Sequence, residues 1–326
     1  MTVLRFLGNL LLALLLIALV ALLLFVGYGV VMSQVWENVE LAHDVDEGQW
    51  VWIDEEPIYY RTHGPEDGSP LVLVHGFEVA GGEMWYANAR DLGRWGVRVI
   101  NVDLRGFGHS ARDALAAYTP SEQASLLANV LDELQVGEAT IAGQGWGSAV
   151  ALQLAVDQPQ FVDRLALVSP LVYEQRIPGI PRPAWRLVDR VPYLRDMAVW
   201  ATLAGGPLWR LRHRQEFYDS SFLDADHWRH LGQATHIVGT ADALLAMVTA
   251  SEDGDLTQAI PDVDVPTLII VGEEDARRTL DSAQRLAREL PDAELITVDE
   301  AGHLVQIERA EEVNVLLTDF CLEGVR

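Results

Sequence analysis

The chain has 326 residues, half of them apolar, which is enough to bury the core of one large α/β domain. Its formal net charge of −25 repels phosphate groups, so we expect no nucleic-acid partner. The single cysteine, Cys321, excludes an intramolecular disulfide and a multi-cysteine metal site.

An uncharged apolar segment opens the chain at residues 6–32, where Asn9 is the only strongly polar residue. As a helix it would be about 40 Å long, enough to cross a bilayer. No small-residue cleavage site follows it, so we predict a retained transmembrane anchor over residues 1–32 rather than a cleaved signal. Arg5 precedes the segment, whereas an acidic stem at 33–48 follows it. The positive-inside rule therefore predicts a single-pass membrane protein with a cytoplasmic N-terminus and its globular domain on the outer side.

Strand and helix patterns alternate along most of the remaining chain. In a first part, residues 49–170, we expect strands at 49–54, 57–64, 71–76, 97–103, 139–144 and 164–169, and helices at 82–94, 121–134 (with Ser121 as its N-cap) and 146–157. In a second part, residues 261–326, we expect strands at 267–275 and 293–300 and helices at 279–290 and 309–321. This alternation predicts a mainly parallel sheet with helices on both faces. Residues 171–260 interrupt it and are rich in Trp, Pro, His and Arg, which we interpret as a helical cap insertion.

Five short motifs stand in a fixed order at the ends of predicted elements. They are His75-Gly76-Phe77, DLRGFGHS at 103–110, GQGWG at 143–147, GEED at 272–275, and AGH at 301–303. Together they resemble the α/β-hydrolase superfamily over about residues 48–322. The resemblance implies an α/β-hydrolase fold with a mostly parallel eight-stranded sheet and a cap over the pocket.

The GQGWG motif has the spacing of a nucleophile elbow, G-x-S-x-G, in which a serine sits at a sharp strand-to-helix turn. Here the middle position is Gly145, which has no side chain to react. Trp146-Gly147 also resembles the D-W-G of epoxide hydrolases and haloalkane dehalogenases, whose nucleophile is an aspartate. Ser148, one helical turn further on, is better explained as a small packing residue, and Ser110 as a structural part of its motif.

The remaining catalytic positions of the resemblance are filled. In the chain order nucleophile, acid, histidine, Asp275 and His303 take the last two roles, with Glu274 as the competing acid. Such a histidine accepts a proton, and the carboxylate holds its tautomer and stabilises its charge. The resemblance also implies an oxyanion hole made by the backbone N–H groups of Phe77 and Trp146. We expect no cofactor.

The aromatic and histidine residues of the cap allow two kinds of interpretation. Trp146, at the elbow, and Trp185, in the cap, are candidate substrate contacts. The cap tryptophans Trp185, Trp200, Trp209 and Trp228 would line a cavity for a small apolar molecule; alternatively these rings pack the cap onto the core. The cap histidines, His213, His227, His230 and His236, lack the spacing of a metal motif such as H-E-x-x-H, so we expect no metal site.

Three interpretations of Gly145 follow. In the first, the protein is a membrane-anchored member of a hydrolase lineage, with altered or reduced activity on a small apolar ester- or epoxide-like substrate through His303 and Asp275. In the second, it is a catalytically inactive ligand-binding or protein-interaction module. In the third, the glycine is a substitution in an ordinary hydrolase. The retained histidine and aspartate favour the first interpretation over the second.

Overall fold

An eight-stranded sheet forms the centre of the molecule in the computed structural model, which describes residues 2–37, 48–173, 185, 188, 190–232, 234–249, 256–277 and 279–323. The strands are β1 (Gln49–Ile53), β2 (Glu56–His63), β3 (Pro70–Val74), β4 (Arg98–Val102), β5 (Ala139–Gln144), β6 (Val162–Val168), β7 (Thr267–Gly272) and β8 (Ala293–Val298). Their order is β1-β2-β4-β3-β5-β6-β7-β8. Strand β2 is antiparallel to both of its neighbours, β1 and β4, whereas every pairing from β4 to β8 is parallel. The predicted mostly parallel eight-stranded sheet is confirmed.

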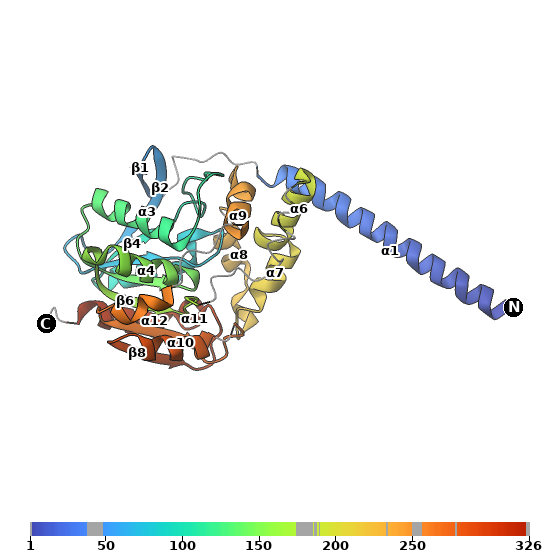
Figure 1. The fold of residues 1–326 in the computed structure, drawn as a ribbon. Helices are drawn as coiled ribbons and strands as arrows, with labels where there is room; N and C mark the ends of the chain where they lie inside the picture. The colour runs from blue at the N-terminus through green and yellow to red at the C-terminus, as the bar shows by residue number, and fades with distance from the viewer. Residues whose placement is uncertain are drawn as a thin grey trace.

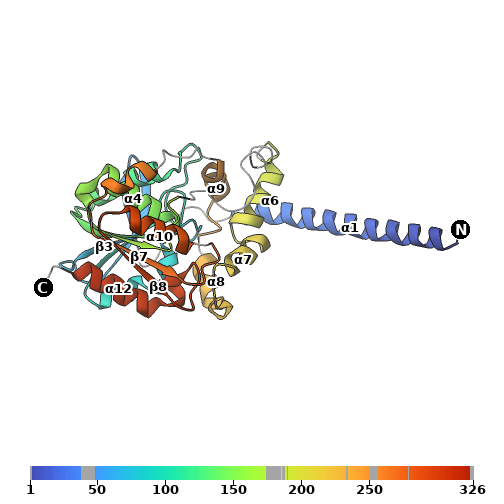
Figure 2. The same cartoon turned by 60° about the horizontal axis from the view of Figure 1, so that its bottom comes forward.

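Helices cover both faces of the sheet, as the alternation predicts (Figure 2). One layer contains α3 (Pro120–Glu133), α4 (Trp146–Asp157) and α10 (Thr279–Glu289), and the other contains α2 (Ala89–Arg94) and α12 (Ala310–Leu322). The buried strand β3 shows why two layers are needed. Val72 and Val74 point into the first apolar cluster, whereas Leu71 and Leu73 point into the second.

The predicted helix over residues 82–94 is wrong in its first half. The segment instead forms a 3₁₀ turn, η1 (Gly81–Trp85), followed by the short helix α2. The N–H of Gly82 donates to an Asp103 carboxylate oxygen at 2.6 Å, and Asn101 Nδ2 donates to the Gly82 carbonyl at 2.8 Å. The N–H and carbonyl of Gly82 thus bind the end of β4 and the residue after it, so they cannot continue an α-helix.

The predicted N-cap at Ser121 is also wrong, because the cap lies two residues earlier. Thr119 has extended backbone geometry, and its side chain accepts a hydrogen bond from the N–H of Glu122 at 3.3 Å. Pro120 occupies the first helical position, where its missing N–H costs nothing and its φ already suits a helix.

The described helices of the segment between β6 and β7 lie at one end of the core (Figure 1). They are α6 (Pro192–Leu203), α7 (Pro207–Arg214), α8 (Ala225–Gly232) and α9 (Thr240–Thr249). The remaining short elements are η2 (Pro159–Phe161), η3 (Ser220–Phe222), η4 (Leu256–Gln258), η5 (Ile260–Asp262) and α11 (Val305–Glu308). We call residues 190–249 of this segment the cap helices.

The N-terminal helix α1 (Thr2–Val35) extends away from the core, and its C-terminal end lies beside α6 (Figure 1). Its span Arg5–Met32 has a mean hydropathy of 3.3 and is long and apolar enough, by length and composition, to cross a membrane. The rings of Tyr28 and Trp200 lie 6.0 Å apart, edge to face. Beyond the helix, the backbone carbonyl of buried Trp36 accepts a hydrogen bond from His236 Nδ1 at 2.7 Å. The end of α1 therefore packs on the cap helices.

Substitution of Gly147 should destabilise the fold, because this glycine lies where α4 meets the end of β3. A Cβ there would lie 2.4 Å from the carbonyl oxygen of His75 and 2.7 Å from that of Val74. Gly147→Ala should lower the free energy of unfolding by about 3 kcal/mol, since backbone atoms have little room to move. Gly137→Ala is the matched control, with no atom near its Cβ, and should change stability by less than about 0.5 kcal/mol. Equal losses in denaturant unfolding of the full chain would contradict this packing argument.

Candidate active site

The candidate residues all follow parallel strands at their carboxyl ends. Phe77 follows β3, Gly145 follows β5, Asp275 follows β7, and His303 follows β8. The carboxyl ends of parallel strands meet at one edge of a sheet, where α/β proteins bind their ligands. The strand order therefore gathers residues that are far apart in the sequence.

Gly145 forms the sharp turn between β5 and α4. Its φ of 54° lies in the left-handed region, and its ψ is −117°. Its N–H donates to the Val168 carbonyl at 2.8 Å, and its own carbonyl accepts from the N–H of Leu171 at 3.0 Å. A Cβ on this residue would lie 3.3 Å from His303 Nε2. The position therefore faces the imidazole directly.

His303 and Asp275 form a buried pair. The distance from His303 Nδ1 to Asp275 Oδ2 is 2.8 Å, and an ionised carboxylate only accepts, so Nδ1 carries the proton. The other oxygen of Asp275 accepts from the N–H of Arg277 at 2.8 Å. Glu274, the competing acid, is exposed and accepts instead from the N–H of Ala301 at 3.0 Å. Of the two acids, only Asp275 hydrogen-bonds the histidine ring.

Burial lowers the pKa of His303 below its usual value of 6.5, and the positive charge of Arg277 lowers it further. The negative charge of Asp275 and its hydrogen bond oppose this shift without cancelling it. His303 is therefore neutral at pH 7. Its Nε2 lone pair, which faces Gly145, is available to take a proton.

Phe77 and Trp146, whose N–H groups form the predicted oxyanion hole, lie on either side of the elbow. The N–H of Glu78 donates to the Gly76 carbonyl at 2.9 Å, which closes a tight turn around Phe77. Trp146 is the first residue of α4, where helix geometry leaves the N–H without an intrahelical acceptor. The ring centroids of Phe77 and Trp146 are 6.2 Å apart and the rings are perpendicular. The two residues of the predicted oxyanion hole are thus neighbours.

The fully buried His75 connects the turn around Phe77 to the loop after β4. Its Nε2 accepts from the N–H of Leu104 at 3.0 Å, so its Nδ1 carries the proton and donates to the Gly76 carbonyl at 2.7 Å. Burial lowers the pKa of His75, which keeps the ring neutral and able to make both contacts. This histidine holds the turn in place.

The other residues singled out by the sequence are engaged elsewhere. The Ser148 hydroxyl donates to the Gly143 carbonyl at 2.7 Å, and the Ser110 hydroxyl donates to the Asp103 carbonyl at 2.5 Å. Both hydroxyls therefore hold turns. Trp185 is buried in the same apolar cluster as Trp146.

A cluster of buried polar residues next to His303 and Asp275 was not predicted from the sequence. Glu216 accepts from the N–H of His303 at 2.8 Å through its backbone carbonyl, and its side chain forms an ion pair with Arg277. Glu78 and His213 lie beside it. Adjacency could have identified Glu78, one residue after Phe77, and Arg277, two residues after Asp275. Nothing local marks His213, in α7, or Glu216, two residues after α7, because both reach the site only through the tertiary fold.

Comparisons with known proteins identify the family of the chain. The sequence matches the model of the alpha/beta hydrolase family over residues 71–315. It is 31% identical over 264 residues to the dihydrolipoyllysine-residue acetyltransferase component of an acetoin cleaving system from Pseudomonas putida, and this match covers 79% of the chain but only 64% of that protein. It is also 29% identical to a 2-hydroxymuconate semialdehyde hydrolase from Pseudomonas putida, with 81% of the chain and 92% of the relative covered.

A solved structure shows the same fold. The meta-cleavage product hydrolase from Pseudomonas fluorescens IP01, in a mutant form complexed with acetates, superposes with a TM-score of 0.69 at 23% identity. The match covers 85% of this chain and 98% of that one. At this identity the likeness establishes the architecture.

The lowered pKa of His303 predicts a pH dependence of stability. In the unfolded chain its pKa returns to about 6.5, so below that pH the unfolded state binds more protons than the folded state. The contribution of neutral His303 to the free energy of unfolding is therefore complete above pH 6.5, and it is lost as the pH falls towards the pKa of the folded state. His303→Gln should lose less stability than the wild type between pH 7.5 and 5.5 in denaturant unfolding. A residual dependence should remain, because buried His75 and His227 also have lowered pKa values. If the free energy of unfolding changed with pH equally in the two proteins, the pKa of His303 would not be lowered in the folded state.

Proposed function

The chain belongs to the alpha/beta hydrolase family, and we propose that it hydrolyses a small apolar ester- or epoxide-like substrate without a covalent intermediate. His303, held by Asp275, would act as general base on a water molecule. The observation that carries this proposal is the direction of the imidazole. Its Nε2 lies 3.3 Å from the point where a nucleophile's Cβ would stand, while its Nδ1 bonds Asp275 at 2.8 Å.

The proposed reaction uses water in the space beside Gly145. His303 Nε2 takes a proton from the water as its oxygen attacks the ester carbonyl carbon. The N–H groups of Phe77 and Trp146 stabilise the negative oxygen of the tetrahedral intermediate. The imidazolium then returns the proton to the leaving alkoxide, which gives an acid and an alcohol. Opening of an epoxide would need the same base and proton donor.

The absence of a nucleophilic side chain is expected to reduce the rate rather than abolish it. Enzymes that lose a member of a catalytic triad retain roughly 10³–10⁴-fold catalysis over water through the oxyanion hole and substrate binding. An apolar substrate would contact Trp146, whose ring lies beside that of Phe77 at the elbow. Trp185 would contact it from the cap. The alternative is a pocket that binds a ligand or a protein without turnover, and the test below separates the two.

The test compares four variants of the full chain in detergent micelles on a short aryl ester and a simple epoxide. His303→Ala should reduce wild-type turnover to the background rate. Gly145→Ser, and Gly145→Asp for the epoxide, should raise turnover by at least about tenfold, because a nucleophile would then face Nε2. Gly145→Ala is the control for backbone strain, which costs of order 1–3 kcal/mol at a positive φ, and should not raise turnover.

Two results would overturn the proposal. Wild-type turnover that survives in His303→Ala would show that the histidine is not the base. A silent wild type that is rescued by Gly145→Ser would show an intact pocket that no longer performs hydrolysis, which favours the ligand-binding alternative.

We further propose that α1 anchors the protein in a membrane, with the N-terminus in the cytoplasm and the globular domain on the outer side. Support comes from the exposed apolar side chains of α1, from Arg5 before them, and from the acidic residues after them. The packing of α1 on α6 would keep the cap helices near the bilayer surface.

Expression in a bacterial host tests the anchor. The full chain should stay in the membrane pellet after alkaline carbonate extraction, because α1 would be held by its apolar surface rather than by charge. Protease added to spheroplasts should digest the globular domain. Release by carbonate would exclude the anchor, and full protection from protease would reverse the proposed orientation. A cytoplasmic protein of the host serves as the control for intact spheroplasts.

A further inference from the structure

We propose that Glu78, His213 and Glu216 form a binding site for one divalent transition-metal ion of the Zn²⁺ type, which connects the cap to the turn that carries Phe77. The ligand atoms would be one carboxylate oxygen of each glutamate and Nδ1 of the histidine. Each of the three side chains is at most 6% exposed. This site stands independently of the proposed hydrolysis.

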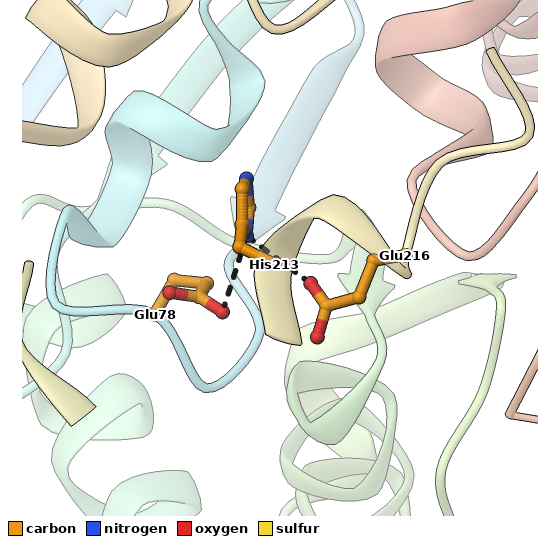
Figure 3. A group of neighbouring side chains, drawn as sticks. All are labelled: Glu78, His213 and Glu216. Carbon is orange, nitrogen blue, oxygen red and sulfur yellow. Dashed lines mark ion pairs between the residues drawn. The ribbon is translucent and has the colours of Figure 1, made fainter. Parts of the chain in front are cut away.

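The three ligand atoms face a common point (Figure 3). His213 Nδ1 lies 3.2 Å from Glu216 Oε2 and 3.7 Å from Glu78 Oε1, and all three atoms lie within 4.8 Å of one another. Ligands about 2.0–2.1 Å from a tetrahedral Zn²⁺ are about 3.4 Å apart. The two distances from the histidine lie on either side of that value, so a small inward movement of the carboxylates would bring the three ligands to tetrahedral spacing, with a water molecule as the fourth ligand.

The other oxygen of each carboxylate has a different partner. Glu78 Oε2 accepts from Trp209 Nε1 at 3.0 Å, and Glu216 Oε1 forms an ion pair with Arg277. These contacts orient the two carboxylates so that Glu78 Oε1 and Glu216 Oε2 face His213. Metal sites use such outer contacts to hold their ligands.

The histidine itself is arranged as a metal ligand. Its Nδ1 is fully buried and makes no hydrogen bond of acceptable geometry within the described part of the chain, although two carboxylates lie beside it. Its Nε2 lies 2.9 Å from Nε2 of His227. With Nε2 of His227 as the acceptor of this hydrogen bond, the proton of His213 lies on Nε2 and its Nδ1 keeps a lone pair. A metal on Nδ1 requires this arrangement, with the second ring nitrogen donating to a neighbour.

The two carboxylates place negative charge beside Nδ1, because Glu216 Oε2 lies 3.2 Å and Glu78 Oε1 lies 3.7 Å from it. Arg277 compensates one carboxylate of the cluster, Glu216, through its other oxygen. The competing explanation is a proton on Nδ1, which would make His213 an imidazolium. The poor hydrogen-bond geometry of Nδ1 towards both carboxylates favours the metal.

The site would join two parts of the molecule. Glu78 belongs to the turn after β3, next to Phe77, whereas His213 lies near the end of α7 and Glu216 lies two residues after that helix, both in the cap. The sequence predicted no metal site, because the cap histidines have no metal-binding spacing. His213 and Glu216 are three residues apart, but Glu78 comes from a distant part of the chain, so local spacing could not reveal the three together.

The test measures zinc bound to the full chain in detergent. The protein is stripped with a chelator, dialysed against excess Mg²⁺ and one to two equivalents of Zn²⁺, and analysed by elemental mass spectrometry. We expect one equivalent in the wild type and less than about 0.1 in His213→Gln and Glu216→Gln. The matched control is His230→Gln, whose Nδ1 contacts one buried glutamate, Glu83, at 2.6 Å and should leave zinc binding unchanged.

A second measurement does not depend on whether the variants fold. Zn²⁺ at about 100 times its Kd should raise the Tm of the wild type by about 5 °C, since the ion binds only the folded state. Co²⁺ in place of zinc should give visible absorption bands of a tetrahedral site.

Less than 0.1 equivalent of zinc in the wild type overturns the site. Equal zinc in His213→Gln and the wild type means an adventitious ion only, and also overturns it. Because these readouts use no substrate, they succeed or fail separately from the hydrolysis test.

Discussion

The close approach of α4 to the ends of β3 and β5 is the constraint on which the site depends. A Cβ on Gly143 would lie 2.4 Å from the carbonyl oxygen of Gly147, and a Cβ on Gly147 would lie 2.4 Å from that of His75. Only glycine fits at both positions. Because the helix begins so close to the strands, Trp146 and the turn around Phe77 stand beside each other. Gly145, midway between the two glycines, faces His303.

Gly145 differs from these two neighbours in what its missing side chain would meet. The nearest atom to its Cβ would be a side-chain nitrogen of His303 at 3.3 Å, not the backbone. Its positive φ suits glycine, but packing does not exclude a small side chain. The chain therefore retains the shape of a nucleophile elbow together with a buried histidine and aspartate, which are supplied by two other strands. This combination supports the proposed base catalysis on water more directly than it supports the alternative, a pocket that binds a ligand without turnover.

The cap helices contact both the N-terminal helix and the candidate site. Glu37, just beyond α1, accepts from the N–H groups of Gly239 and Ala241 at the start of α9, at 3.1 and 2.5 Å. At the other end of the cap, Glu216 accepts from the N–H of His303. The cap helices thus make specific hydrogen bonds both to the residue after α1 and to the candidate histidine, His303.

The sequence by itself determined the class of fold, the five motifs at the strand ends, and the position of the vacant nucleophile, because each depends on local spacing and on alternating elements. Element ends were less predictable, since the cap at Thr119 and the contacts of Gly82 depend on neighbouring chain. Only the tertiary structure decided between Asp275 and Glu274 as the partner of His303, because adjacent loop residues point in different directions. It alone placed His213 and Glu216 against Glu78, since the packing of α7 on the turn after β3 leaves no periodic or local signal in the sequence.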